Sequence, residues 1–256
     1  MLATASSHYD RQARLVAVGL AATRRAWRSN TTPALAATLA TLQIRAAREA
    51  DQAIAANVAE QSLAAPEIAR LNPGAFTTAS DGRPLGSLLT QAATYSALQT
   101  MVATQIADTG RAASSVAIAS RPALTGYIRN VGATCCSRCA ILAGRFYPRS
   151  SGFLRHSNCK CTMVATTRGG FGEVIETPDD LFRAGRITDL SKDDARAIEM
   201  GADMSRVVNV RRTASGLKVA GKVQVRGGKL TPAGIFNLAS DNDDALRMLA
   251  KAGYIR

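Results

Sequence analysis

Five cysteines and one of the two histidines of this chain gather in a single central stretch. The stretch holds two clusters of these residues, separated by a loop of sixteen residues. Two short spacings joined by a loop are typical of a tetrahedral zinc site, because each spacing lets one turn present two ligands. Thiolates and imidazole also favour zinc over magnesium or calcium. The expected ligands are four of Cys136, Cys139, His156, Cys159 and Cys161, with Cys135 as an extra neighbour.

Spacing alone leaves open which residue stays outside the site. Residues i and i+2 of an extended segment point to the same side, which favours Cys159 and Cys161 together. A ring nitrogen of His156 competes with Cys159 for the metal. The preferred set is Cys136, Cys139 and Cys161 with either His156 or Cys159. Four such ligands close the coordination sphere, so the expected zinc is structural.

Three other interpretations of the cysteines remain open. Disulfides are disfavoured by the odd number of cysteines and by the lack of an export signal at the N-terminus. Free reduced thiols are the second alternative. The third is a catalytic pair in which His156 activates Cys135 or Cys139, but no orienting third group can be identified from the sequence.

The same central stretch is strongly basic. The chain has a formal net charge of +13, and residues 131–171 contribute six basic and no acidic side chains. Such a segment can contact nucleic-acid phosphates, with nearby aromatic rings as stacking groups. The alternative is a solvated loop whose aromatic residues form a small core of their own. Five of these six basic residues are the candidate phosphate contacts, namely Arg138, Arg145, Arg149, Arg155 and Lys160, and the rings are those of Phe146, Tyr147 and Phe153.

Much of the 46% hydrophobic content is alanine, and the aromatic fraction is only 5%. Small side chains suit closely packed helices better than a sandwich or barrel. Apolar periodicity predicts helices over residues 9–27, 33–63 and 85–118, the last interrupted near Gly110. Residues 126–163 lose this periodicity, which predicts a compact, loop-rich module.

Local start and stop signals in the C-terminal part of the sequence predict short helices and strands. Helices are expected over residues 178–184, with Thr177 as cap, and over residues 192–200, with Ser191 as cap. A further capped helix is expected over residues 241–252, and another helix opens at Thr231 and Pro232. Residues 207–225 are polar and β-branched, which predicts short strands. The paired aspartates at the helix starts are interpreted as caps rather than as catalytic carboxylates. His8 is expected on the surface, and no stretch is apolar enough to predict a membrane span.

Three stretches of the chain resemble the Mu F-like minor head proteins of tailed phages, in the form found in actinobacteriophages. The first joins residues 136–145, which begin with Cys136-Ser137-Arg138-Cys139, to His156-Ser157-Asn158-Cys159-Lys160-Cys161. The second is residues 201–209, and the third runs from Leu230-Thr231-Pro232 to Gly253-Tyr254-Ile255. Ser157 replaces the proline usual in the family and Lys160 replaces an arginine, but neither change removes a metal ligand.

The resemblance implies a structural virion component that associates with the portal protein inside the capsid. It implies a role in head assembly, DNA packaging or ejection, with the major capsid protein and packaged DNA as further partners and the host cytoplasm as the place of assembly. Relatives labelled capsid maturation proteases supply the alternative function, although the sequence has no recognisable nucleophile setting. A zinc-knuckle DNA-binding protein is the third interpretation.

The sequence therefore predicts a predominantly helical α+β protein without a membrane partner. Residues 1–125 are expected to form an extended helical arm or bundle that binds the portal. Residues 126–170 are expected to form the small zinc-stapled module, since a helix-poor segment of this size lacks a sufficient core of its own. Residues 171–256 are expected to form short helices with a minor β element.

Overall fold

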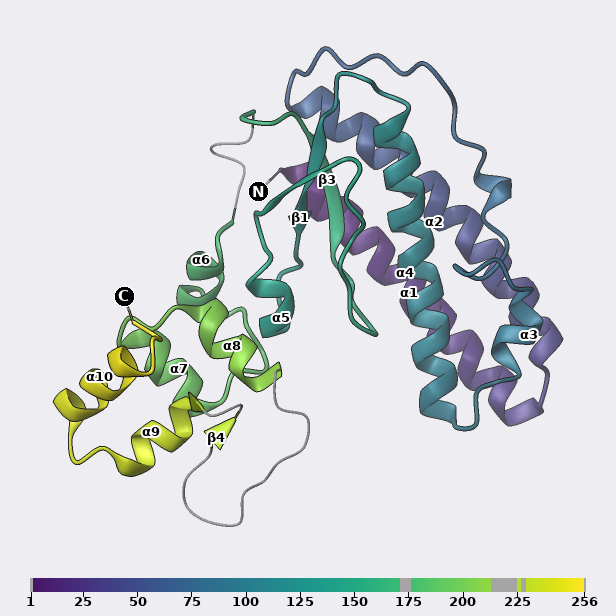
Figure 1. Cartoon of the computed structure of the whole chain (residues 1–256). Helices are drawn as coiled ribbons and strands as arrows, with labels where there is room; N and C mark the ends of the chain where they lie inside the picture. Colours follow the sequence, from purple (N-terminus) through teal and green to yellow (C-terminus); the bar gives the residue numbers. More distant parts are fainter. Residues whose placement is uncertain (1, 171–175, 213–224, 227–228, 256) are drawn as a thin grey trace. The chain divides into compact units, whose positions relative to one another are not determined.

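The computed structural model is predominantly helical with a small sheet, which confirms the predicted fold class (Figure 1). Contacts divide the chain into two compact units. The first unit contains residues 1–132 and 143–176, and the second contains residues 133–142 and 177–256. This grouping differs from the three expected parts, because the long helices and most of the central segment share the first unit. The structure describes residues 2–170, 176–212, 225–226 and 229–255.

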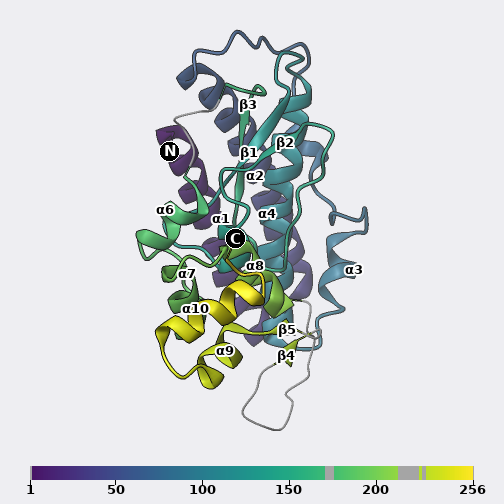
Figure 2. The ribbon, with the colours of Figure 1, turned by 60° about the vertical axis from the view of Figure 1, so that its left-hand side comes forward.

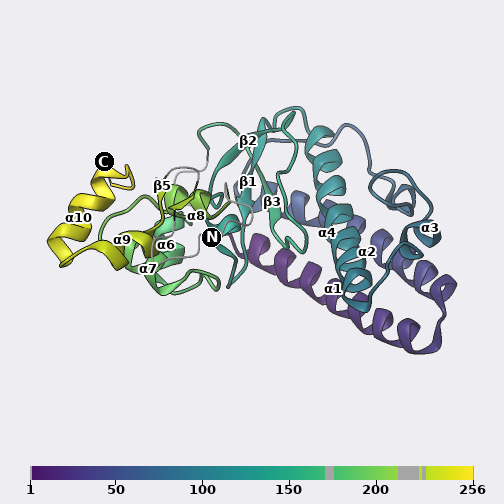
Figure 3. The ribbon, with the colours of Figure 1, turned by 60° about the horizontal axis from the view of Figure 1, so that its bottom comes forward.

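The first unit is built on three long helices that pack along one another (Figure 3). They are α1 (Ala3–Ser29), α2 (Thr32–Glu60) and α4 (Tyr95–Ala119). Asn30 adopts the left-handed conformation, with φ 52°, and reverses the chain between α1 and α2. Glu60 at the end of α2 accepts hydrogen bonds from the backbone N–H groups of Ala3 (2.9 Å) and Thr4 (3.0 Å). The carboxylate of α2 thus satisfies the free donors at the start of α1.

The third predicted helix is divided at a different place from the one expected. Its two parts are α3 (Leu85–Leu89) and α4, and α4 begins after Thr94, whose hydroxyl accepts from the Ala97 N–H. The predicted interruption near Gly110 is wrong, because Gly110 lies inside α4. A Cβ at Gly110 would lie 2.6 Å from Oε1 of Gln12 on α1. This glycine therefore allows α1 and α4 to approach closely and does not interrupt α4.

A three-stranded antiparallel sheet completes the first unit, with the order β2-β1-β3. The central strand β1 (Gly126–Asn130) pairs with β2 (Phe146–Pro148) on one side and β3 (Thr162–Thr166) on the other. Sequence analysis predicted a loop-rich segment here and missed the sheet. All residues of β1 and β3 are buried, so these strands lack the alternation of apolar and polar residues that reveals a strand with one exposed face.

The second unit holds several short helices (Figure 2). Their buried side chains form a small apolar core. The predicted caps are confirmed, since Thr177, Ser191, Thr231 and Asp241 each accept a hydrogen bond from the backbone N–H three residues ahead. Tyr254 is fully buried, and its hydroxyl donates to the Leu230 carbonyl at 2.8 Å. The helices are α5 (Ser137–Ala140), α6 (Pro178–Arg183), α7 (Lys192–Glu199), α8 (Met204–Arg212), α9 (Pro232–Leu238) and α10 (Asn242–Lys251).

The prediction of strands over residues 207–225 is wrong for residues 207–212, which belong to a helix. Helix α8 extends to Arg212, and Met204, Val207 and Val208 bury one face of it at helical spacing. The β-branched composition suggested a strand, but burial against the unit's core decided for a helix. Strand β4 (Val225–Arg226) pairs with β5 (Lys229–Leu230), while residues 213–224 lie outside the described part.

His8 is buried on α1, so its predicted surface position is wrong. Only 2% of the residue is exposed, and neither ring nitrogen has a hydrogen-bond partner in the structure. Burial, with a smaller contribution from the nearby Arg11 charge, lowers the pKa of His8 to about 4. The imidazole is therefore neutral in the folded protein at neutral pH.

Acidification should destabilise the first unit through His8. The unfolded chain binds a proton at His8 below pH 6.5, whereas the folded chain does so only near pH 4. Stability contributed by neutral His8 is thus complete above pH 6.5 and is lost as the pH falls, by about 1.4 kcal/mol per pH unit. Between pH 7.5 and pH 5.0, the free energy of unfolding measured in urea should fall by about 2 kcal/mol more in the wild type than in His8→Leu. Equal losses in the two proteins would contradict this role.

Candidate metal centre

The short helix α5 presents the first two cysteines. Cys136 is its N-cap residue in an extended conformation, and its carbonyl accepts from the Cys139 N–H at 3.0 Å. Asp189 fixes this turn, because its carboxylate accepts from the Ser137 N–H at 2.6 Å and from the Ser137 hydroxyl at 3.1 Å. One turn of helix therefore carries both thiols in a fixed relation. Asp189 escaped the sequence analysis because its partner lies 52 residues away.

The loop before β3 presents the other three residues. Asn158 adopts the left-handed conformation, with φ 61°, and Cys159 N–H donates to the His156 carbonyl at 3.1 Å. Cys161 then leads directly into β3, whose Thr162 lies opposite Asn130 at the end of β1. The sheet register therefore places Cys161 beside the point where the chain leaves β1 on its way to α5.

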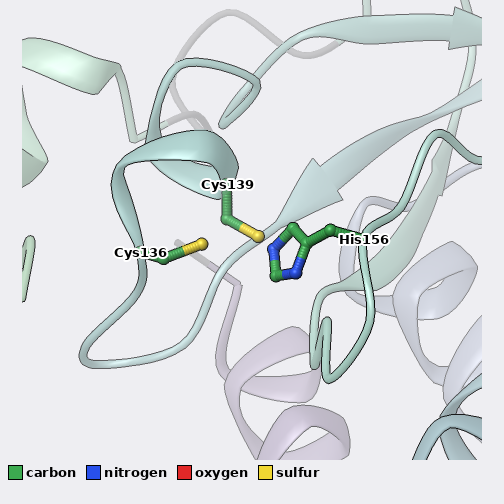
Figure 4. A group of neighbouring side chains, drawn as sticks. All are labelled: Cys136, Cys139 and His156. Carbon is green, nitrogen blue, oxygen red and sulfur yellow. The ribbon is translucent and has the colours of Figure 1, made fainter. Parts of the chain in front are cut away.

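The thiols and the imidazole come together as two overlapping groups. Cys136, Cys139 and His156 form one group and Cys139, Cys159 and Cys161 form the other, and the ligand atoms within each lie within 4.8 Å of one another. Figure 4 shows Cys136 and Cys139 pointing from α5 and the chain before it toward the ring of His156. Ligands of a tetrahedral zinc ion with 2.3 Å zinc–sulfur bonds stand about 3.8 Å apart. The cluster can therefore hold a metal ion, and Cys139 belongs to both groups.

The tautomer of His156 suits metal binding. Its Nδ1 lies 2.7 Å from the carbonyl oxygen of Ser157, and a carbonyl can only accept. Nδ1 must therefore carry the proton, which leaves the lone pair on Nε2. Metal-binding histidines characteristically donate their second ring nitrogen to a carbonyl or carboxylate in this way.

Side chains of α1 and α4, which the sequence analysis did not select, also bind the backbone of this loop. Arg111 of α4 donates to the carbonyls of Cys159 (3.0 Å) and Cys161 (3.2 Å). Gln12 of α1 donates to the carbonyl of Lys160 at 3.1 Å. In the sequence, Arg111 and Gln12 each appear as a polar residue on an otherwise apolar helix face. This pattern does not identify the residue that each of them binds.

The remaining predicted residues take other places. Cys135 lies outside both groups, and its backbone N–H and carbonyl bond to Arg186 and Thr188. Tyr147 and Phe153 stack on Tyr127 at 5.3 and 5.9 Å, which supports the interpretation of these rings as core. A nucleic-acid contact stays a prediction for the basic set, whose residues are exposed: Arg138, Arg145, Arg149, Arg155 and Lys160.

Comparisons with protein-family models, with curated proteins and with solved structures each find no match to this chain. Among the residues that the structure describes, no helix has the length and apolar character required to cross a membrane.

One metal ion per chain is the expected content of the cluster. Native mass spectrometry of protein purified under reducing conditions should show a mass excess of one zinc that disappears on denaturation. Cys139→Ser should abolish the excess, because Cys139 belongs to both ligand groups. Cys135→Ser is the matched control and should keep the metal. A metal-free wild type, or zinc retained by Cys139→Ser, would contradict the assignment.

Proposed function

We propose that the cluster binds one structural Zn²⁺ through four of its five ligands, and that the chain is a structural minor head protein of a tailed phage. The observation that carries the metal proposal is the convergence of soft ligands from α5 and from the loop before β3. Cys139, Cys159 and Cys161 are each no more than 3% exposed, so the thiolates lie where water does not compete for the ion. A closed site of this kind stabilises a fold rather than supplying an open position for a substrate.

The place of the protein in the virion rests on the three stretches of resemblance. A unit built on three long helices suits a component that assembles with the portal protein inside the capsid. The net charge of +13 is compatible with an interior filled with DNA, where binding to phosphate depends steeply on salt. Head assembly, DNA packaging and ejection are the roles that this position allows.

A capsid maturation protease is the second candidate, favoured by the proximity of Cys139 to His156. The same histidine lies equally within the group that contains Cys136, so the ring faces two thiols, which is an arrangement of ligands rather than of one nucleophile and its base. Co-expression with the major capsid protein distinguishes the two functions. We expect the capsid protein to remain intact, and cleavage that depends on this chain would overturn the structural assignment.

Portal association should depend on the exposed face of α1. Val18 is 48% exposed in the middle of this helix, and the exposed Arg14 and Arg25 lie on the same face at helical spacing. Val18→Asp should greatly reduce co-purification with the portal protein, because an apolar contact is replaced by a charge that must be desolvated. Leu238→Asp is the matched control, since Leu238 is 49% exposed on α9. Equal recovery of both variants with portal would contradict binding through the helical half.

A further inference from the structure

Arg111 is a buried cation that binds the backbone of the loop before β3, residues 156–161, which we call the metal loop. It has two kinds of partner. Only 4% of the residue is exposed, although it sits in the middle of α4. Its Nη1 donates to the carbonyls of Cys159 and Cys161, and its Nη2 lies 2.5 Å from Asp108 Oδ1. One guanidinium therefore connects the core of the helical bundle to two metal-ligand residues.

The two carbonyls indicate which backbone conformation of the loop Arg111 stabilises. In an extended segment, residues i and i+2 direct their carbonyls to one side and their side chains to one face. A planar guanidinium that binds both carbonyls therefore favours the extended form of Cys159-Lys160-Cys161. Gln12 holds the intervening carbonyl of Lys160, so all three consecutive carbonyls receive a donor from α1 or α4.

The charges around Arg111 do not cancel. Asp108 also binds Arg155, with Nε 2.6 Å from Oδ1 and Nη2 2.5 Å from Oδ2. Two guanidinium groups thus share one carboxylate, which leaves one positive charge next to the loop. The ring of Phe153 lies 5.3 Å from the Arg111 guanidinium and further restricts its position.

We propose that Arg111 is a positioning residue for the metal centre, which orients Cys159 and Cys161 and offsets the charge of the thiolate-bound ion. This inference rests on the proposed metal site. Zn²⁺ with three thiolates and one imidazole carries a net charge of −1, and with four thiolates −2. A buried anion of this kind is costly without a nearby cation, and Arg111 supplies a cation that Asp108 and Phe153 already hold in place.

Metal affinity of full-length variants tests the proposal. Arg111→Gln removes the charge and the double contact, and it should weaken Co²⁺ and Zn²⁺ binding about 10- to 100-fold in competition with a chromophoric chelator. Arg111→Lys keeps the charge but offers a compact ammonium in place of the planar fork, so it should restore part of the lost affinity. The thiolate-to-cobalt absorption bands of the Co²⁺ protein should shift in Arg111→Gln, because the ligands lose their orientation and their nearby cation.

Arg121→Gln is the matched control. Arg121 lies just beyond α4, is also 4% exposed, and pairs with Glu67 rather than with the metal loop. Its loss should lower the stability of the unit while leaving the metal affinity and the cobalt spectrum unchanged. If Arg121→Gln weakened binding as much as Arg111→Gln, the effect would be general destabilisation and the proposal would be overturned.

The outcomes separate this proposal from the one on which it rests. A wild type that binds neither Co²⁺ nor Zn²⁺ would remove the metal site and the role of Arg111 together. A wild type that binds metal beside an Arg111→Gln protein with the same affinity and spectrum would overturn the role of Arg111 alone. If Arg111→Gln does not fold, Arg111→Lys decides, since an affinity about 10-fold weaker supports the proposal and an unchanged one refutes it.

Discussion

The pairing of β1 with β3 is the constraint on which the central part of this protein depends. It sets Asn130 opposite Thr162, and the side-chain amide of Asn130 reinforces the pair by donating to the Thr162 hydroxyl at 3.0 Å. A shift of one residue would turn every side chain of β3 to the other face of the sheet. The same shift would displace Cys161, which precedes β3 directly. The register of a short buried strand thus determines the position of a candidate metal ligand.

Buried polar groups hold the helical unit in one arrangement. Gln43 of α2 donates to the Thr78 carbonyl (2.9 Å) and to the Thr109 hydroxyl (3.0 Å), while Asn130 also donates to the Ala5 carbonyl on α1. Alanines that pack closely bury little area each, so they define helix register only weakly. A polar group that must find its partner penalises every other register, because an unpaired buried donor is expensive. Arg111 extends this system of contacts to the metal loop.

Local signals made part of the fold predictable. The caps at Thr177 and Ser191 and the opening of α9 at Thr231 are fixed by residues within one turn, so sequence analysis located them correctly. His8, Gly110 and α8 were misinterpreted for one shared reason. Their roles depend on what packs against them, namely the interior for His8, Gln12 for Gly110 and the second unit's core for Val207.

The sequence by itself determined the helical class, most helix starts and the set of five metal-ligand candidates, because composition, capping and cysteine spacing act over a few residues. Only the tertiary structure decided that Cys139 joins both ligand groups and that the carbonyls of residues 159–161 are held by Gln12 and Arg111. These contacts connect residues up to 148 positions apart. Their geometry follows from sheet register and helix packing, which are properties of the folded chain and have no local signature.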